Sequence, residues 1–534
     1  MVAQRQPASA RPRGSRPPRV VVIGAGVGGL ACAIDLARQG LDVTVLERSK
    51  ALGGKLRQVA IGDHRLDAGP TVFTMRWVFD ELFASAGTSL ETELSLRPAG
   101  VLARHAWSTD ERLDLFADLE RSVDAISAFA GSDEGRRYRR FCSRAAEVYR
   151  TLEAPFLRAS RPTPLSLTTR VGVRGLPALL RIAPFTTLWS ALGEHFRDPR
   201  LRQLFGRYAT YCGSSPYAAP ATLMLVAHVE RQGVWLVDGG MHRIAEALAG
   251  LAARLGATVR LGAEVREIAV RDGRARGVVV TVADGGDEFI DADAVVFNGD
   301  VAALGAGLLG DAARSAAATV AAASRSLSAV TWNIVGRCTG FPLLRHNVFF
   351  GSDYADEFAA IFGRGQVPLD PTAYVCAQDR GDDAVAPGDR ERLLCLTNAP
   401  ARGDSAPLDA KELQQCRQRL TNVLGRCGLA IEASPESVVT TTPREFEELY
   451  PGSGGSLYGR ASHGWAASFS RPGARSRIAG LYLAGGTVHP GPGVPMAALS
   501  GRQAAASLLA DRAKDRASTA RFPPPATRGG MSTP

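Results

Sequence analysis

The sequence predicts an α/β fold in which one α/β domain is interleaved with a second, α+β domain. Three observations lead to this prediction. The chain has 534 residues, 45% of them hydrophobic, which is long enough for two domains and too apolar for a disordered protein. A β-branched run at 20–23, "VVVI", leads directly into a glycine-rich turn. A second glycine-rich turn, at 485–493, follows a short apolar run near the other end of the chain.

The first glycine-rich turn has the pattern of a phosphate-binding turn. Gly24, Gly26 and Gly29 form G-x-G-x-x-G, with Gly28 inside it, and the next predicted strand, "DVTVLE", ends in Glu47. Gly24 permits a tight turn, Gly26 lets a pyrophosphate approach the backbone, and Gly29 lets the following helix pack closely. The free N–H groups of that helix attract the phosphates, and Glu47 accepts hydrogen bonds from ribose hydroxyls. Strand, turn, helix, strand and acid stand in the order of a Rossmann-like domain, which favours a dinucleotide site over a turn without a ligand.

The segment after Glu47 favours FAD over NAD. A second glycine pair in "RSKALGGKLRQ" is followed by two basic residues, which extend the phosphate site. This extension resembles the flavoprotein amine-oxidase superfamily, in which it follows the ribose-binding acid. The alternative is an ordinary connecting loop. The resemblance implies that five residues of this segment contact FAD: Arg48, Gly53, Gly54, Lys55 and Leu56.

The middle of the chain returns to the nucleotide-binding domain. Residues 233–270 predict a turn, an amphipathic helix and two strands, and "DADAVVFNGD" at 291–300 predicts another strand. In the superfamily, Val265 matches the valine whose backbone contacts the adenine. The strand within 291–300 matches the one that ends near the flavin phosphates.

Several motifs together resemble the bacterial carotenoid desaturases, the family of the phytoene desaturases. They include "DAGPTVFTMRWVFDELF" at 67–83, "GGMHRIAEAL", "NVFFGSDYADEF" at 347–358 and "YLAGGTVHPGPGVPMAALSG". The resemblance runs from about residue 19 to 510. Within the family, the first of these motifs resembles the hydroxyneurosporene and methoxyneurosporene 3,4-desaturases. Asp238, in "LVDGGM", stands where relatives often have proline, which puts the conformation of a loop near the flavin in doubt.

The resemblance implies an FAD-dependent oxidoreductase that introduces the 3,4 double bond into an acyclic carotenoid of the 1-hydroxy- or 1-methoxy-neurosporene type. A phytoene-type desaturase is the alternative within the family, followed by an amine oxidase. A non-catalytic isoprenoid-binding protein on the same fold is the alternative from another class. No Ser/His/Asp set or metal-binding cluster stands out, which agrees with chemistry carried by a flavin, and no metal is expected. Oxygen or a membrane quinone is the expected electron acceptor.

The domain boundaries follow from these motifs. We expect the FAD-binding domain to comprise residues 19–75, 232–300 and 478–510, and the substrate and membrane-contact domain to comprise 76–231 and 301–477. A basic disordered tail, 1–18, and a flexible tail, 511–534, flank them. Within the substrate domain, residues 207–230 suit the wall of a long tunnel as well as plain core.

The charge distribution argues against a nucleic-acid partner. Residues 1–19 carry five arginines and no acid, so much of the net charge of +10 lies at the ends of the chain rather than on the fold. Residues 161–193 hold four arginines and no acid among apolar side chains such as Phe185 and Trp189. That mixture is typical of a membrane-surface element, or of core helices whose arginines reach out to solvent.

The sequence also predicts where in the cell the protein is found. No apolar run is long enough to span a membrane, and the eight scattered cysteines indicate neither a disulfide framework nor a metal site. We therefore expect a reduced, cytoplasmic protein that associates peripherally with the inner membrane.

The second glycine-rich turn completes the predicted flavin site. "LYLAGG" predicts the last strand of the nucleotide-binding sheet, so that Gly485 and Gly486 approach the flavin phosphate and ribityl chain. A helix then begins with Pro495 in its first turn, where proline is tolerated, and Gly493 and Val494 face the ring. His489 is a candidate proton acceptor or a hydrogen-bonded turn residue. The structural role is favoured, because a single histidine without a visible partner is weak support for a base.

Overall fold

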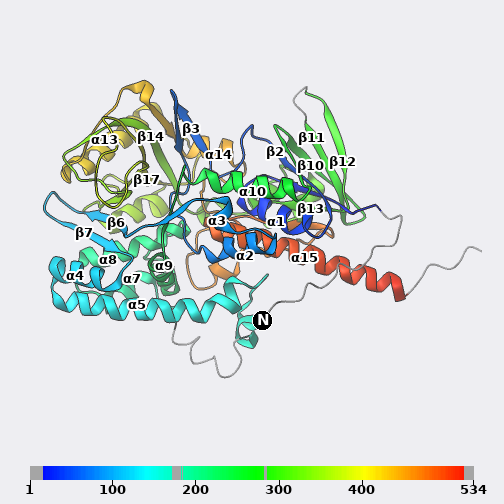
Figure 1. The fold of residues 1–534 in the computed structure, drawn as a ribbon, viewed down its shortest axis with the longest axis horizontal. Helices are drawn as coiled ribbons and strands as arrows, with labels where there is room; N and C mark the ends of the chain where they lie inside the picture. Colours follow the sequence, from blue (N-terminus) through cyan, green and yellow to red (C-terminus); the bar gives the residue numbers. More distant parts are fainter. Residues whose placement is uncertain (1–15, 171–181, 183–184, 282–284, 522–534) are drawn as a thin grey trace, which may run out of the picture.

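The computed structural model describes residues 16–170, 182, 185–281 and 285–521. A five-stranded sheet organises the part of the molecule that contains both ends of the described chain (Figure 1). Its strands lie in the order β20-β13-β1-β2-β9, and every neighbouring pair is parallel. They span Arg19–Ile23 (β1), Asp42–Glu47 (β2), Thr258–Leu261 (β9), Ala294–Phe297 (β13) and Leu481–Leu483 (β20).

The five-stranded sheet is covered on both faces, which explains the continuous apolar run of β1. Val20 and Val22 face a core shared with helices α1 (Val27–Ala37), α10 (His242–Arg254) and α15 (Val494–Arg521). Val21 and Ile23 face the opposite core, against a three-stranded antiparallel sheet. That sheet comprises β10 (Glu264–Arg271), β11 (Arg274–Thr281) and β12 (Asp287–Asp291). Successive residues of a strand point to opposite faces, so a strand buried on both faces needs no polar alternation.

An eight-stranded sheet organises the other part of the molecule (Figure 1). Its order is β18-β14-β17-β16-β15-β6-β7, with β19 paired to β14. The strands span Val101–Ala106 (β6), Arg112–Phe116 (β7), Ser328–Thr339 (β14), His346–Phe349 (β15), Ala373–Ala377 (β16), Glu391–Ala399 (β17), Ala430–Glu432 (β18) and Val438–Thr441 (β19).

Helices cover this second sheet. Helix α13 (Ala410–Arg426) packs on β14 and β17 in one apolar core. A second core joins β6 and β7 to a helical layer. The layer comprises α4 (Leu119–Ala130), α5 (Ser132–Leu152), α7 (Leu188–His195), α8 (Pro199–Gly206), a 3₁₀ turn η2 (Arg207–Cys212), a 3₁₀ turn η3 (Ala221–Met224) and α9 (Leu225–Arg231).

Shorter elements connect the two parts. They are β3 (Gln58–Ile61), β4 (His64–Asp67), α2 (Trp77–Ser85), α3 (Leu90–Glu93), β5 (Leu96–Pro98), the π-helical turn η1 (Glu153–Leu157), β8 (Trp235–Val237), α11 (Val301–Gly305), α12 (Tyr354–Phe358) and α14 (Pro443–Leu449). Asp238, directly after β8, accepts hydrogen bonds from Ser95 and Arg97 beside β5. Its carboxylate therefore fixes a surface connection.

The structure confirms the α/β fold and the predicted strands and helices of the nucleotide-binding motif. It differs from the sequence prediction at the C-terminal end, where a flexible tail was expected from residue 511. Helix α15 continues to Arg521, and the Asp511 carboxylate pairs with Arg475 at 2.8 Å and accepts from the Tyr482 hydroxyl at 3.1 Å. Within the described part of the chain, no helix is long and apolar enough to cross a membrane.

Candidate active site

One cavity of about 890 Å³ runs between the two parts of the molecule. At one end, which we call the nucleotide end, its wall is built from the turns after β1, β2, β13 and β20. At the other, which we call the apolar arm, the wall comes from η2, η3, α9 and the strands β14, β16 and β17. The stretch 207–230 contributes many of these residues, in agreement with the tunnel interpretation of the sequence.

The turn after β1 holds its shape through close backbone packing. Gly24 has a φ of +98°, a conformation that favours glycine. A Cβ atom at Gly29 would lie 2.1 Å from the Gly24 carbonyl oxygen, and one at Gly28 would lie 2.5 Å from Oδ1 of Asn298. Gly24, Gly26 and Gly28 line the cavity, whereas Gly29 lies behind them. Gly29 therefore serves the packing of α1, and the other glycines expose backbone to a ligand.

The acid at the end of β2 faces the cavity with both oxygens held. Glu47 accepts from the Ala25 amide at 2.9 Å and from the Ser49 amide at 2.8 Å. Each carboxylate oxygen has a second lone pair that can accept from a ribose hydroxyl. Arg48 and Val265 line the same end of the cavity. The Arg48 guanidinium also donates to the Leu449 carbonyl at 2.6 Å, which ties the turn to the C-terminal end of α14.

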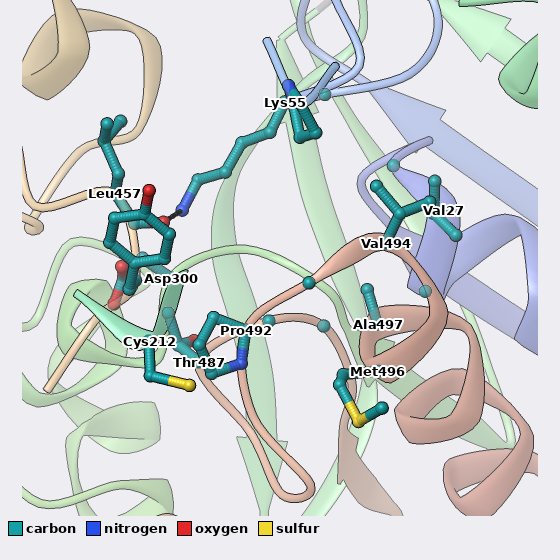
Figure 2. A pocket seen from close by; sticks show the side chains of 18 of the residues that line it. Val27, Lys55, Cys212, Asp300, Leu457, Thr487, Pro492, Val494, Met496 and Ala497 are labelled. Carbon is teal, nitrogen blue, oxygen red and sulfur yellow. Dashed lines mark hydrogen bonds between the residues drawn. The ribbon is translucent and has the colours of Figure 1, made fainter. Parts of the chain in front are cut away.

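The second glycine pair brings a buried lysine into the cavity. Gly53 and Gly54 have positive φ values of +99° and +56°, and both line the cavity together with Lys55 and Leu56. Figure 2 shows the Lys55 side chain extending to the Leu457 carbonyl, to which Nζ donates a hydrogen bond. Burial lowers the pKa of Lys55, and the nearby Asp300 opposes that change.

Three cavity residues were not identified from the sequence. Asn298 donates to the Gly24 carbonyl at 3.1 Å. Asp300 accepts from the Ala302 amide through Oδ1, and its buried Oδ2 has no hydrogen-bond partner among the described residues. Arg471 is buried and donates to the carbonyls of Tyr458 and Arg460. The first two belong to the "VVFNGD" segment that the sequence placed here, but no motif marked Arg471.

The second glycine-rich turn forms a further part of the wall of the nucleotide end, next to the first. Gly485, Gly486, Gly493 and Val494 all line the cavity, with φ values of +104° at Gly485 and +119° at Gly493. Helix α15 begins at Val494, with Pro495 in its first turn as predicted. Figure 2 shows Val494 and Met496 across the cavity from the tip of Lys55. A helix N-terminus therefore opens onto this wall.

His489 lies in the same turn but does not line the cavity. It is 2% exposed, and its Nε2 donates to the Phe156 carbonyl at 2.9 Å. Nδ1 has no partner within the described chain. Burial lowers the pKa of His489 to about 4, so the ring is neutral at pH 7. This geometry agrees with the structural role that the sequence analysis favoured.

Apolar side chains surround one opening of the cavity. Leu167, Ile182, Trp465 and Phe469 line it. Nearby, Leu165 and Phe185 are 75% and 74% exposed, and the Phe185 ring meets that of Trp465 at 5.5 Å. We call Leu165, Phe185 and Trp465 the exposed apolar group.

Part of the predicted membrane element is not at this surface. Trp189 packs against Tyr217 and Tyr354, with ring centroids 4.7 and 6.0 Å apart. Residues 171–181, which include Arg174 and Arg181, lie outside the described residues.

Comparisons with known proteins agree with this geometry. Residues 27–509 match the family of flavin-containing amine oxidoreductases. The chain is 55% identical over 516 residues to a hydroxyneurosporene desaturase from Rubrivivax gelatinosus, covering 96% of this chain and 97% of that protein. It is 47% identical to a hydroxyneurosporene desaturase from Cereibacter sphaeroides, covering 93% and 98%. The fold is similar to that of cyclohexylamine oxidase from Brevibacterium oxydans IH-35A, with a TM-score of 0.53, 16% identity and coverage of 93% and 100%.

Proposed function

Because the chain belongs to the flavin-containing amine oxidoreductase family, and within it to the carotenoid desaturases, we propose that it introduces the 3,4 double bond into an acyclic 1-hydroxy- or 1-methoxy-carotenoid of the neurosporene type. The observation that supports this most is the similarity to a hydroxyneurosporene desaturase along nearly the whole chain. The cavity agrees with it, because a long apolar arm joins the nucleotide end.

FAD is the cofactor of this family, and the residues of the nucleotide end fit it. The turns after β1 and β20 expose backbone to the cavity through glycines, which leaves room for a pyrophosphate. The unpartnered Oδ2 of Asp300 can accept a hydrogen bond from a ribityl hydroxyl. Glu47 would hold the ribose, and Val265 the adenine. Bound flavin supplies the hydride acceptor that removal of two hydrogens from a hydrocarbon requires.

The chain's own contribution is to hold a long apolar molecule in a dry cavity. Leu223, Val226 and Val229 from η3 and α9 line the apolar arm together with Leu394 and Leu396 from β17. These side chains exclude water and fix the polyene beside the nucleotide end, which removes much of the entropic barrier to reaction.

Charged groups at the nucleotide end support the redox step. The N-terminus of α15 faces the cavity and stabilises negative charge beside Gly493 by roughly 0.3–1 kcal/mol, and by up to about 2 kcal/mol when partly buried. Lys55 and Arg471 add two buried basic groups to the same region. A site of this kind favours an electron-rich, reduced ring over an oxidised one.

Peripheral attachment to a membrane would supply the substrate. The exposed apolar group lies beside the opening lined by Leu167 and Phe469, and exposed apolar side chains of this kind mark interaction surfaces. A carotenoid would then pass from the bilayer into the apolar arm. Oxygen or a membrane quinone takes up the electrons afterwards.

The test is product analysis with purified protein and liposomes. We expect a yellow, flavin-containing protein that converts 1-hydroxyneurosporene, with little conversion of phytoene. Conversion of phytoene without conversion of any 1-hydroxycarotenoid would contradict the substrate. A colourless protein that binds carotenoid without turnover would support the non-catalytic alternative instead.

A further inference from the structure

A cluster of polar side chains lies in the wall of the otherwise apolar arm. The Tyr208 hydroxyl donates to Oε2 of Glu230, and the Tyr211 hydroxyl donates to Oε1 at 3.1 Å. Nη2 of Arg207 donates to the Tyr211 oxygen at 3.0 Å. Arg207, Tyr211 and Glu230 line the cavity, whereas Tyr208 stands behind them. The three cavity-lining residues, Arg207, Tyr211 and Glu230, are called the polar cluster below.

The hydrogen bonds of the polar cluster are incomplete. Arg207 is only 9% exposed and Glu230 only 5%. Nε of Arg207 is buried and has no hydrogen-bond partner within the described part of the chain. Oγ1 of Thr331, on β14, is also buried without a partner and lines the same cavity. A buried donor without a partner is costly, and Arg207 and Thr331 both line the cavity, so this place suits a ligand atom that accepts hydrogen bonds.

The charges of the polar cluster select a neutral ligand group. Burial disfavours the charge of Arg207, but Tyr211 and Glu230 keep its pKa above the ordinary value. Burial raises the pKa of Glu230, while Tyr208 and Arg207 oppose that change. A carboxylate ligand would face Glu230 at close range, and like charges in a low-dielectric site repel. An alcohol or an ether oxygen meets no such repulsion.

We infer that the polar cluster binds the oxygen of the substrate's end group, and so distinguishes a hydroxylated or methoxylated carotenoid from the hydrocarbon. This inference rests on the proposed function and identifies residues that determine its specificity. Arg207 donates to the oxygen, which both a hydroxyl and a methoxyl group accept. The hydroxyl hydrogen in turn has Glu230 and Tyr211 as acceptors. A hydrocarbon end leaves the buried Nε of Arg207 and the Thr331 hydroxyl without a partner, and a site built for a hydroxyl rejects such a ligand strongly.

The position of the polar cluster also suits the bond that reacts. The turn η2 runs from Arg207 to Cys212, and Figure 2 shows Cys212 in the part of the cavity wall that contains Thr487 and Pro492. A 3₁₀ turn rises by about 2 Å per residue, so Arg207 and Cys212, at the two ends of η2, are on the order of 10 Å apart. In a 1-hydroxycarotenoid the oxygen lies roughly 4 Å from the C3–C4 bond, because three single bonds of about 1.5 Å separate them. A C3–C4 bond roughly 4 Å from an oxygen held by Arg207 can therefore lie on the side of the nucleotide end.

Arg207→Met tests this inference, because it keeps an unbranched chain and removes the donors. We expect wild-type kcat/KM to be higher for 1-hydroxy- and 1-methoxyneurosporene than for neurosporene. In the variant, kcat/KM for both oxygenated substrates falls about 10- to 100-fold, while the value for neurosporene changes less than threefold. Most of the loss lies in KM. Tyr211→Phe lowers kcat/KM for the two oxygenated substrates about three- to tenfold. It replaces Arg207→Met as the test if that variant does not fold.

The matched control is Arg202→Met, one turn earlier. Its guanidinium lies over Trp189 at 4.7 Å and does not line the cavity, so the substrate preference stays as in the wild type. Flavin content and thermal midpoint are measured for every variant. An Arg207→Met enzyme that is folded, loaded with flavin and still prefers the oxygenated substrate would overturn the inference.

A binding measurement separates this inference from the proposed function. Quenching of tryptophan fluorescence by 1-hydroxyneurosporene and by neurosporene gives the two affinities without turnover. Tighter binding of the hydroxylated polyene, lost in Arg207→Met, supports the polar cluster even if neither compound is oxidised. Selective binding without oxidation of either compound would reject only the proposed reaction. Equal affinities in the wild type would reject the polar cluster as a recognition site.

Discussion

The two ends of the cavity are built in different ways. At the nucleotide end the wall is largely backbone, exposed by glycines in turns that follow strands. In the apolar arm the wall is side chains from helices and from the middle of strands. A wall made of backbone binds phosphates through N–H groups, which nearly every residue has. Its specificity therefore depends on where glycines leave those N–H groups accessible. A side-chain wall can change its ligand through single substitutions while the fold stays the same.

Gly493→Val is the strongest test of the backbone wall. Gly493 has a φ of +119°, which valine rarely adopts, and it lines the cavity. We expect flavin content to fall at least tenfold and activity to disappear. Flavin absorbance per protein after gel filtration measures this. Gly363→Val is the control, because Gly363 has no positive φ and no neighbouring atom within 4 Å. Normal flavin content and turnover in Gly493→Val would show that this turn does not hold the ring.

Glu47→Ala tests a side chain of the nucleotide end. The change removes the proposed acceptor for ribose and also the acceptor for the Ala25 and Ser49 amides. FAD affinity should weaken by about 1–3 kcal/mol, the cost of leaving buried polar groups unpaired. Titration of the apoprotein with FAD measures it. Glu47→Gln, which keeps one acceptor oxygen, should lose less, and an unchanged affinity in Glu47→Ala would contradict the placement.

Phe185→Asp combined with Leu165→Asp tests the opening of the apolar arm. Both residues are highly exposed beside the cavity, and a charge there opposes insertion into lipid. The fraction of protein that floats with liposomes should fall by at least half. Leu369→Asp is the control, since Leu369 is equally exposed but does not line the cavity. Equal flotation of the double variant and the wild type would mean that this surface does not contact membranes.

His489→Gln should have the smallest effect, because His489 supports the turn from behind. Burial lowers its pKa to about 4, whereas an unfolded histidine titrates near 6.5. Between about pH 6.5 and pH 4 the unfolded state binds a proton at this histidine and the folded state does not. The contribution of neutral His489 to the free energy of unfolding is therefore complete above about pH 6.5 and is lost as the pH falls towards 4.

The variant should keep its flavin, lose part of its rate, and show a smaller decrease in stability between pH 7 and pH 5, by at most about 1.4 kcal/mol per pH unit. Urea unfolding at the two pH values measures this. Other buried histidines, such as His228, are present in both proteins and cancel in the difference. Identical pH dependence in the two proteins would contradict a neutral, buried His489.

The difference between the two ends of the cavity explains which of its residues can be predicted from the sequence. The nucleotide end is encoded in short, contiguous motifs, so Gly24, Glu47, Gly53 and Gly485 were identified from spacing and family resemblance. Asn298 and Asp300 lay in a segment recognised as a whole. The polar cluster lies within the stretch 207–230, but no spacing rule shows that Tyr211 joins Arg207 to Glu230, because that depends on how η2 and α9 are placed in the fold. Arg471 was missed for the same reason, since its partners are backbone carbonyls without a motif.

The packing of α1 against α15 has a consequence for biosynthesis. A Cβ atom at Gly501 would lie only 1.9 Å from the Gly28 carbonyl oxygen, so the two helices touch through their backbones behind the cavity. During translation α1 leaves the ribosome hundreds of residues before α15 does. The early domain half must therefore persist without its partner helix, exposing the apolar face that α15 later covers. We therefore expect that a nascent chain ending before residue 501 exposes this apolar face and retains no FAD.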